Sequence, residues 1–500
     1  MNGIRSVSGV CTAGLAQLRQ KREVENTMTR NQNGFLLSAL AGLAVAGVAS
    51  AGPILICPTW DLEIGQPGAV GGSVSGVERI GGEVFVGGGF DSLGGQPGTT
   101  RWGRYDIATG QFSGLGNSSP DNFVSGFFTY DDGNGEQVYI TGSFNSVTVD
   151  GQALPNSRGL VRWDGVTVSA IPNSPFTGTF DFMWDGLDYN GLLVTGGNGG
   201  FFDGGTIVQK PTFATWDGTT WNTWSNEFDG LVAPVILAMT EFQGEVYFGG
   251  RFSTFDEDLS DPNNPLVESN NIMKWDGTDF SGVGGGVFRA TSIVSQVLAL
   301  QVFDDGSGEK LYVGGRFDRL GSQSGTVSPA VARWDGTQWE ALPGFPQSGR
   351  EVRDFEVFNG ELYAVGNFES TDLGQARKFA KWNGTSWEEV GGGFGLGAST
   401  DNPAAITSTD DSLIVGGAFT QAGNGVGPGS GSATGLAEWV ALCDTECDGD
   451  VTGDNTVDLA DLNLVLANFG ETTSEGDADG NGEVDLGDLN LVLANFGTNC

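Results

Sequence analysis

Short apolar strands that end in glycine recur through the middle of the chain. Polar loops of variable length separate them. The seven copies, spaced 51 to 65 residues apart, are EVFVGGGF (83–90), QVYITGSF (137–144), LLVTGGN (192–198), EVYFGGRF (245–252), KLYVGGRF (310–317), ELYAVGNF (361–368) and SLIVGGAF (412–419). Self-similarity at a roughly constant period of this length predicts one structural unit repeated along the chain.

A second pattern follows most of these strands, and it places a tryptophan before a turn dipeptide. Its copies are VRWDG (161–165), ATWDG (214–218), MKWDG (273–277), ARWDG (332–336) and AKWNG (380–384), with weaker versions at 103–110 and 436–440. Asp-Gly and Asn-Gly suit the positive φ angles of a type I′ turn, so each copy predicts a tight β-hairpin. The strand after the turn is also recognisable, as in TSWEEVG (385–391).

One complete unit, residues 351–391, therefore contains four antiparallel strands. Seven such units predict an all-β fold, a seven-bladed β-propeller over residues 57–443, with a capped solenoid as the alternative. The last unit lacks its fourth strand, and residues 59–65 near the N-terminus match the missing pattern. We expect this segment to complete the last blade and close the ring without exposed sheet edges.

The repeats resemble bacterial secreted propeller proteins and, more distantly, kelch-type and cortical-marker propellers. That resemblance implies a fold and not a function, because propellers serve as binding modules and as enzymes. Within the repeats, we expect Trp163, Trp216, Trp275, Trp334 and Trp382 to pack between blades and not to form sugar platforms. The acidic hairpins 131–135 and 304–308 are expected to be turns and not ion sites. The polar insertion 255–268 is interpreted as a solvated loop or a ligand contact.

The C-terminal residues contain two near-identical halves, 450–470 and 477–497, each beginning with a 12-residue loop of EF-hand spacing. Ligand positions 1, 3, 5, 7, 9 and 12 hold Asp450, Thr452, Asp454, Thr456, Asp458 and Asp461 in the first loop and Asp477, Asp479, Asn481, Glu483, Asp485 and Asp488 in the second. Calcium is a hard cation that takes six to eight oxygens, and position 7 supplies a backbone carbonyl. The spacing predicts two bound calcium ions and argues against the alternative, a merely acidic, solvated tail.

A short apolar helix is predicted after each loop, and Val457 and Val484 are expected to join the loops through a β-like contact. Helices this small form little core, so metal binding should be coupled to folding. The duplicated loop and exit helix resemble a type I dockerin, here residues 447–500, which implies a cohesin-like partner. Leu459-Ala460 and Leu486-Gly487 replace that family's partner-reading hydroxyl pairs. The replacement indicates a different protein surface, or packing against the propeller.

The composition of this 500-residue chain excludes some kinds of catalytic and metal site and disfavours some partners. It contains no histidine, which excludes Ser-His-Asp and Cys-His catalysis and imidazole metal sites. A formal net charge of −39 argues against nucleic acid and anionic membranes as partners.

The N-terminal residues 1–51 are interpreted as a leader. Arg30 and the apolar run 35–49, ending in Ala-Ser-Ala, indicate a signal peptide that starts at Met28. A membrane anchor is the alternative, for which this run is barely long enough. Export favours disulfides, and we expect Cys57–Cys443 and Cys447–Cys500.

The function expected from these patterns is a secreted or cell-surface, non-catalytic propeller. It would bind carbohydrate or protein and attach through its calcium module. Two alternatives remain: a carbohydrate-active hydrolase or lyase that uses paired carboxylates in the propeller channel, and a structural envelope protein. The sequence singles out no catalytic residue and no cofactor besides calcium.

Overall fold

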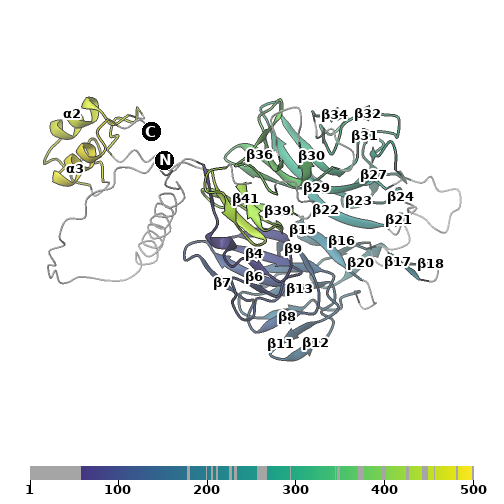
Figure 1. The fold of residues 1–500 in the computed structure, drawn as a ribbon. Coiled ribbons are helices and arrows are strands. Elements are labelled where there is room, and N and C mark those ends of the chain that lie inside the picture. The colour runs from purple at the N-terminus through teal and green to yellow at the C-terminus, as the bar shows by residue number, and fades with distance from the viewer. Residues whose placement is uncertain are drawn as a thin grey trace, which may run out of the picture. The chain divides into compact units, whose positions relative to one another are not determined.

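A computed structural model describes residues 58–497. It omits segments 177–180, 199, 204–205, 210–211, 225–227, 230–233, 256–266, 293, 344, 346–349, 370–376, 396–400, 424–426, 442–448, 455 and 480–481. The chain divides into two compact units: Trp60–Trp439, and a second that comprises Met1–Thr59 and Val440–Cys500. The first unit is built of strands, and the helices α2 and α3 lie in the second (Figure 1).

The described part of the larger unit contains seven four-stranded antiparallel sheets. Their first strands are β3 (Val74–Ile80), β9 (Val124–Asp131), β15 (Met183–Tyr189), β22 (Val235–Phe242), β29 (Gln296–Asp304), β35 (Glu351–Phe358) and β39 (Asn402–Ser408). The second strands, which carry the glycine pattern, are β4 (Glu83–Gly88), β10 (Glu136–Gly142), β16 (Leu192–Gly197), β23 (Glu245–Arg251), β30 (Glu309–Arg316), β36 (Glu361–Glu369) and β40 (Ser412–Ala418).

Five of the seven third strands end at the pattern tryptophan. The third strands are β6 (Trp102–Asp106), β13 (Leu160–Trp163), β19 (Phe213–Trp216), β26 (Ile272–Trp275), β33 (Val331–Trp334), β37 (Arg377–Trp382) and β43 (Leu436–Val440). The fourth strands are β7 (Gln111–Ser113), β14 (Val168–Ala170), β20 (Trp221–Trp224), β27 (Phe280–Gly282), β34 (Trp339–Ala341), β38 (Trp387–Glu389) and β1 (Thr59–Asp61). The predicted four-stranded repeat is confirmed.

Short strands in the connecting loops form six small sheets among the described residues. They are β2 (Ala69–Val70) with β5 (Ser92–Leu93), β8 (Ser118–Pro120) with β11 (Val147–Val149) and β12 (Gln152–Leu154), β17 (Gly200–Asp203) with β18 (Thr206–Gln209), β21 (Phe228–Asp229) with β24 (Thr254–Phe255) and β25 (Val267–Glu268), β28 (Val287–Phe288) with β31 (Arg319–Leu320) and β32 (Thr326–Val327), and β41 (Gln421–Ala422) with β42 (Gly431–Ser432).

The seven first strands contact one another in chain order, and β39 also contacts β3. Figure 1 shows β9, β15, β22, β29 and β39 near the middle of the larger unit. Glycines of the second strands permit this approach: a Cβ added to Gly249 would lie 2.3 Å from Val297 of the next sheet. A Cβ on Gly416 of the last sheet would lie 2.4 Å from Val74 of the first. The repeated glycine therefore marks contact between successive sheets, the last and first included.

The N-terminal strand β1 is the outer strand of the last sheet, whose order is β1-β43-β40-β39. The predicted pairing of this segment with the last repeat is therefore observed, although only residues 59–61 are extended and a 3₁₀ turn, η1 (Glu63–Gly65), follows. Trp60 is 2% exposed, and its indole nitrogen donates to the Gly391 carbonyl at 2.7 Å. Trp60 also meets Trp439 of β43 edge to face, at 5.2 Å between ring centroids.

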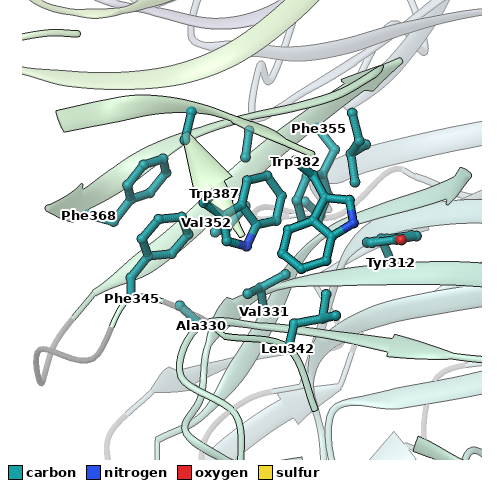
Figure 2. Packing of buried hydrophobic residues seen from close by; sticks show 14 of the residues in the cluster. Tyr312, Ala330, Val331, Leu342, Phe345, Val352, Phe355, Phe368, Trp382 and Trp387 are labelled. Carbon is teal, nitrogen blue, oxygen red and sulfur yellow. The ribbon is translucent and has the colours of Figure 1, made fainter. Parts of the chain in front are cut away.

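Apolar side chains fill the spaces between neighbouring sheets. In one cluster, Trp382 and Phe355 of the sixth sheet pack with Tyr312 of the fifth (Figure 2). The five pattern tryptophans are at most 5% exposed. Trp163 lies edge to face with Phe85 of the preceding sheet, at 5.5 Å. The prediction that these tryptophans pack between repeats and are not surface platforms is confirmed.

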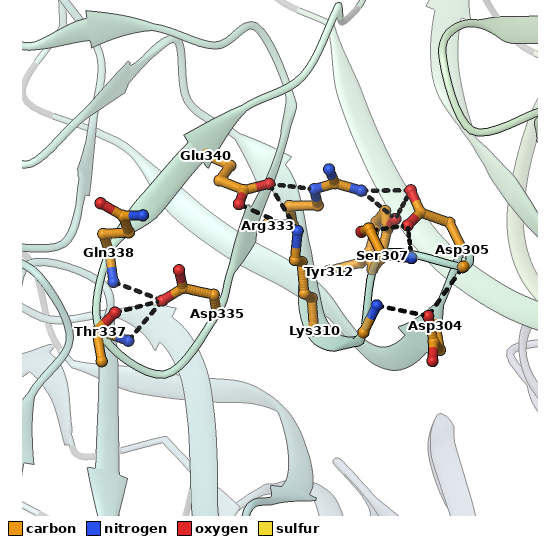
Figure 3. A network of polar contacts seen from close by, with 12 residues as sticks. Asp304, Asp305, Ser307, Lys310, Tyr312, Arg333, Asp335, Thr337, Gln338 and Glu340 are labelled. Carbon is orange, nitrogen blue, oxygen red and sulfur yellow. Dashed lines mark hydrogen bonds and ion pairs between the residues drawn. The ribbon is translucent and has the colours of Figure 1, made fainter.

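The hairpin after each pattern tryptophan is a four-residue loop, so the predicted two-residue type I′ turn is wrong here. Trp334 pairs directly with Trp339, and between them the Asp335 carboxylate accepts the backbone N–H groups of Thr337 and Gln338 at 2.7 and 2.8 Å (Figure 3). These bonds lower the pKa of Asp335 to about 2. The aspartate thus acts as a side-chain acceptor in this turn, and the left-handed residue is Gly336.

The acidic hairpins are turns, as predicted. Asp304 accepts the N–H groups of Gly306 and Gly308 at 2.8 and 2.9 Å, which closes the turn (Figure 3). Asp305 forms an ion pair with Arg333 and accepts from the Tyr312 hydroxyl at 3.0 Å. Both carboxylates are thus used within the fold, which leaves them unsuited to hold an ion.

The C-terminal unit contains α2 (Leu459–Ala467) and α3 (Leu486–Ala494), which confirms the two predicted helices. Its core consists of four fully buried valines, Val457, Val465, Val484 and Val492. The backbone contact expected between Val457 and Val484 is wrong. Val484 instead bonds to Gly470 and Glu471 after α2, and the Val457 carbonyl accepts from Gly497 after α3. Each loop therefore forms backbone hydrogen bonds with the residues that follow the helix of the other half.

The leader, the four remaining cysteines and residues 256–266 of the polar insertion lie outside the described residues. No helix in the described part of the chain is long and apolar enough to cross a membrane.

Candidate functional site

The first C-terminal loop gathers three carboxylates beside the start of α2. Oxygens of Asp450, Asp454 and Asp461 lie within 4.8 Å of one another. Asp461 is fully buried, and its carboxylate accepts the backbone N–H groups of Asp458 at 2.8 Å and Thr452 at 3.0 Å. Although burial acts to raise the pKa of Asp461, these hydrogen bonds hold it below its usual value. The cluster thus contains a buried, ionised carboxylate.

The second loop repeats this arrangement with Asp477, Asp479 and Asp488, whose oxygens also lie within 4.8 Å of one another. Asp488 is fully buried and accepts the N–H groups of Ala478, Asp479 and Asp485 at 2.6 to 3.0 Å. Against the effect of burial, these bonds lower the pKa of Asp488. The duplicated sequence therefore yields two three-carboxylate clusters, from loop positions 1, 5 and 12 in the first half and 1, 3 and 12 in the second.

Other predicted ligand positions have different roles. Asp458 and Asp485 at position 9 are helix N-caps, and each accepts an N–H group from the first turn at 2.6 Å. Thr452 donates its hydroxyl to Asp461 at 2.9 Å, which places this oxygen in the first cluster. Thr456 donates to Asp454 at 2.6 Å. Glu483 at position 7 is exposed, and Asn481 lies outside the described residues.

Apolar side chains are exposed on both helical halves. In the first half these are Leu459, Leu466 and Phe469, and in the second Leu486, Leu493 and Phe496, with exposed fractions of 45% to 64%. The residues match in pairs between the halves. Leu459 and Leu486 are the positions where the sequence departs from the dockerin pattern, and the structure leaves both exposed, at 63% and 64%.

The first strands of all seven sheets line a central cavity of about 750 Å³. Six acidic residues line it, and among them are Glu78 from β3, Asp185 from β15, and Asp354 and Glu356 from β35. The sequence analysis did not identify these residues. Carboxylates that converge in this way are expected in a channel that binds or transforms a ligand, and are not expected in an inert channel.

Asp185 and Asp354 occupy equivalent positions, immediately after the β-bulge in their strands. Each carboxylate accepts the amide that follows it and an amide of the next first strand, from Met239 at 2.7 Å and Ile406 at 2.9 Å. Burial raises the pKa of Asp185 to about 6 and that of Asp354 to about 8. These two residues connect neighbouring strands and place charge in the cavity.

Glu78 and Glu356 lie two residues further along their strands. Glu356 accepts from the Ser408 hydroxyl at 2.6 Å, whereas Glu78 forms no hydrogen bond with any described residue. Glu78 is open to the cavity, but the surrounding protein leaves it less hydrated than a surface glutamate. This loss of water and the charges of Glu356, Asp354 and Asp185 raise the pKa of Glu78 to about 8. Burial also raises the pKa of Glu356.

The sequence does mark Asp185 and Asp354 as unusual, but this can be recognised only once the bulges have been located. The five other residues equivalent to Asp185 and Asp354 are all glycine or alanine: Gly76, Gly126, Ala238, Ala299 and Ala405. Alignment on the glycine pattern alone does not fix this register, because one residue is inserted at each bulge.

No family model matches the chain, and no curated protein matches it. Similar solved structures include the computationally designed Ika8 protein (13% identity, 76% of this chain and 100% of that chain, TM-score 0.36). The RRP9 WD40 repeats align at 9% identity over 74% of this chain and 94% of that chain, with TM-score 0.38. The extracellular domain of BT4673 from B. thetaiotaomicron aligns at 10% identity over 76% and 39%, with TM-score 0.43. At these values the likenesses carry no information on ligand or activity.

Proposed function

We propose that this chain is an exported ligand-binding protein whose C-terminal unit binds two calcium ions and attaches the larger unit to a partner. The observation that carries the proposal is the pair of three-carboxylate clusters, each with a buried aspartate held ionised by backbone N–H groups. Oxygen ligands with this alternation suit calcium, a hard cation. The leader expected at residues 1–51 and the expected cysteine pairs would suit export to an oxidising compartment.

The larger unit is, in this proposal, a closed seven-bladed β-propeller. Seven four-stranded sheets, the cycle of contacts among their first strands and the placement of β1 in the last sheet support it. A ring of this kind presents a central channel, and the acidic cavity described above lies there. The channel is the proposed ligand site.

The C-terminal unit is proposed to act as a dockerin-like attachment module. Residues 449–497 contain acidic side chains but no lysine or arginine, and leucine and phenylalanine are exposed on both helices. A protein surface with an apolar centre and a basic rim would complement this face. Because the exposed leucines replace the hydroxyl pairs of known dockerins, the proposed partner is a cohesin-like protein with an apolar contact region.

Calcium titration of the mature chain tests the first part. Isothermal calorimetry should detect two ions per chain, and Asp461→Asn or Asp488→Asn should each remove one. Glu475→Gln, an exposed acidic residue of the same unit outside both clusters, is the matched control and should bind two. Absence of calcium binding by the wild-type chain would refute the assignment, as would two intact sites in the Asp461→Asn variant.

A second candidate, a polysaccharide hydrolase or lyase, is favoured by one observation. The cavity holds carboxylates of unequal acidity, with a pKa of about 8 for Glu78 and about 6 for Asp185, as a general acid and base require. Release of reducing or unsaturated sugars from a polysaccharide panel, abolished by Glu78→Gln, would establish it. Retention on a glycan array without turnover would support the non-catalytic function instead.

A further inference from the structure

The central cavity has an excess of acidic side chains. Eight charged residues line it, six acidic and two basic: Glu78, Arg79, Glu136, Asp185, Asp188, Arg353, Asp354 and Glu356. Both arginines already have acidic partners: Arg79 pairs with Asp410 at 2.6 Å, and Arg353 with Glu351 at 2.6 Å. Arg79 acts weakly on Glu356, and β22, β29 and β39 contribute no charged group to the lining. The carboxylates therefore remain largely unbalanced.

The cavity does not resemble the two clusters of the C-terminal unit. Among the described residues, only those clusters bring three acidic side chains within 4.8 Å of one another. The channel carboxylates are spread over β3, β15 and β35, which are not consecutive sheets of the ring. A single metal ion would be too small to contact them together. A ligand with several positive groups and a connecting chain can reach them.

Apolar side chains complete the lining. Leu187 and Leu300, both partly buried, line the same cavity from β15 and β29, whereas Phe128 of β9 is buried and stacks on Tyr139. These positions are equivalent or adjacent to those of the two glutamates on the other strands. The surface therefore combines separated carboxylates with aliphatic side chains, which suits an alkyl chain that carries amino groups.

We propose that the central cavity binds a small organic polyamine, a chain of methylene groups with two or more ammonium groups. The carboxylates of Glu78, Asp354 and Glu356 accept from the ammonium groups, and Leu187 and Leu300 contact the chain between them. This inference rests on the proposed ligand-binding function and names the chemical class of its ligand. Glu78, which has no hydrogen-bond partner among the described residues, gains one in the complex.

Proton release distinguishes such a ligand from a neutral one. The pKa of Glu78 and that of Asp354 are about 8, so both side chains carry a proton for much of the time at pH 7.5. A bound ammonium group stabilises the ionised form and lowers both pKa values. Each carboxylic acid then loses its proton to the buffer, and its O–H bond breaks as the N–H···O contact forms. Binding should release roughly one to two protons per ligand at this pH.

The test uses the mature, calcium-loaded chain, spermidine as the probe and 1,8-octanediol as an uncharged chain of similar length. Calorimetry at pH 7.5 in 0.15 M salt, in two buffers of different ionisation enthalpy, measures both affinity and proton release. We expect spermidine to bind with proton release and octanediol not to bind. Glu78→Gln and Glu356→Gln should each weaken spermidine binding at least about tenfold, a factor typical of a lost charged contact.

Glu241→Gln is the matched control, because Glu241 is an exposed acidic residue on first strand β22 outside the cavity lining. It should bind spermidine as the wild type does. Glu78→Gln should fold normally, since glutamine resembles the protonated glutamic acid, and a thermal melt checks this.

Binding of spermidine with the same affinity in Glu78→Gln would overturn the inference, as would binding without proton release. Binding of a glycan in the cavity, lost in Glu78→Gln while spermidine shows none, would overturn the ligand class but retain the proposed ligand-binding function. Absence of both polyamine and glycan binding would refute the inference and the ligand-binding function together. The calcium titration is independent of all these outcomes.

Discussion

The channel and the C-terminal loops both contain several carboxylates, but the surroundings of these carboxylates differ in the two regions. Asp461 is fully buried, yet backbone N–H groups and a threonine hydroxyl point at its oxygens, and its pKa is lowered. Glu78 is open to a cavity and has no hydrogen bond to a described residue, and its pKa rises to about 8. In the loops the hydrogen bonds therefore outweigh the effect of burial on the pKa, whereas in the channel burial and the neighbouring carboxylates outweigh the hydrogen bonds.

The reason lies in the local backbone. A tight loop that leads into a helix has free N–H groups, and these converge on the residue inside the loop. In a sheet, nearly all N–H groups are already paired with neighbouring strands. Asp185 and Asp354 still find donors, in the amide that follows each of them and in an amide of the next first strand. The loops thus contain carboxylates that hydrogen bonds keep ionised, whereas burial raises the pKa values of the channel carboxyl groups.

The largest expected effect is a different response of the two units to calcium removal. All 13 tryptophans lie between residues 60 and 439, so fluorescence reports on the larger unit alone. Calcium removal by a chelator should unfold the C-terminal unit, whose core consists of four valines, because ion binding supplies most of its stability. Helical circular dichroism should fall, while the tryptophan melting temperature should change by less than about 2 °C. An equal shift in both signals would show that the larger unit also depends on calcium.

The next effect concerns the sheet that the N-terminal strand completes. Trp60→Ala removes an indole that is 2% exposed and packed against Trp439, and should cost about 3–5 kcal/mol in unfolding free energy by urea titration. Trp339→Ala at the equivalent position of the fifth sheet is the comparison, because a hairpin holds its strand and its side chain is partly exposed. We expect the smaller loss there. Equal losses would mean that β1 depends on Trp60 no more than β34 depends on Trp339.

The pH dependence of the larger unit should follow the channel carboxylates. Their folded pKa values, about 8 for Glu78 and Asp354, exceed the unfolded value of about 4. The folded state therefore binds these protons more tightly, and its extra stability is fully present below pH 4 and lost as pH rises through 8. The urea midpoint, followed by tryptophan fluorescence, should fall from pH 5 to pH 8.5. Glu78→Gln should flatten this slope and Glu241→Gln should not.

Much of the fold could be predicted because its signals are periodic. The glycine pattern marks contacts between sheets, as Gly249 and Gly416 show, and it located every second strand. The incomplete last repeat identified residues 59–65 as the segment that supplies its missing strand, of which 59–61 are extended. The C-terminal clusters were likewise predictable, since their ligands are close together in sequence. Channel residues such as Glu78 and Glu356 were not, because they lie far apart in the chain and meet only through ring geometry and bulge register.

The smallest effect tests why aspartate recurs after the pattern tryptophans. If its carboxylate is needed as an acceptor, Asp335→Ala should lower the unfolding free energy by about 1 kcal/mol, because two exposed backbone N–H groups lose their partner to water. Asn383→Asp, in a loop with the same two bonds to Thr385 and Ser386, should change it by less than about 0.5 kcal/mol, since either side chain accepts. Tryptophan-detected urea titration of both variants measures this difference. If the turn depended on the left-handed backbone at Gly336 alone, Asp335→Ala would be as mild as Asn383→Asp.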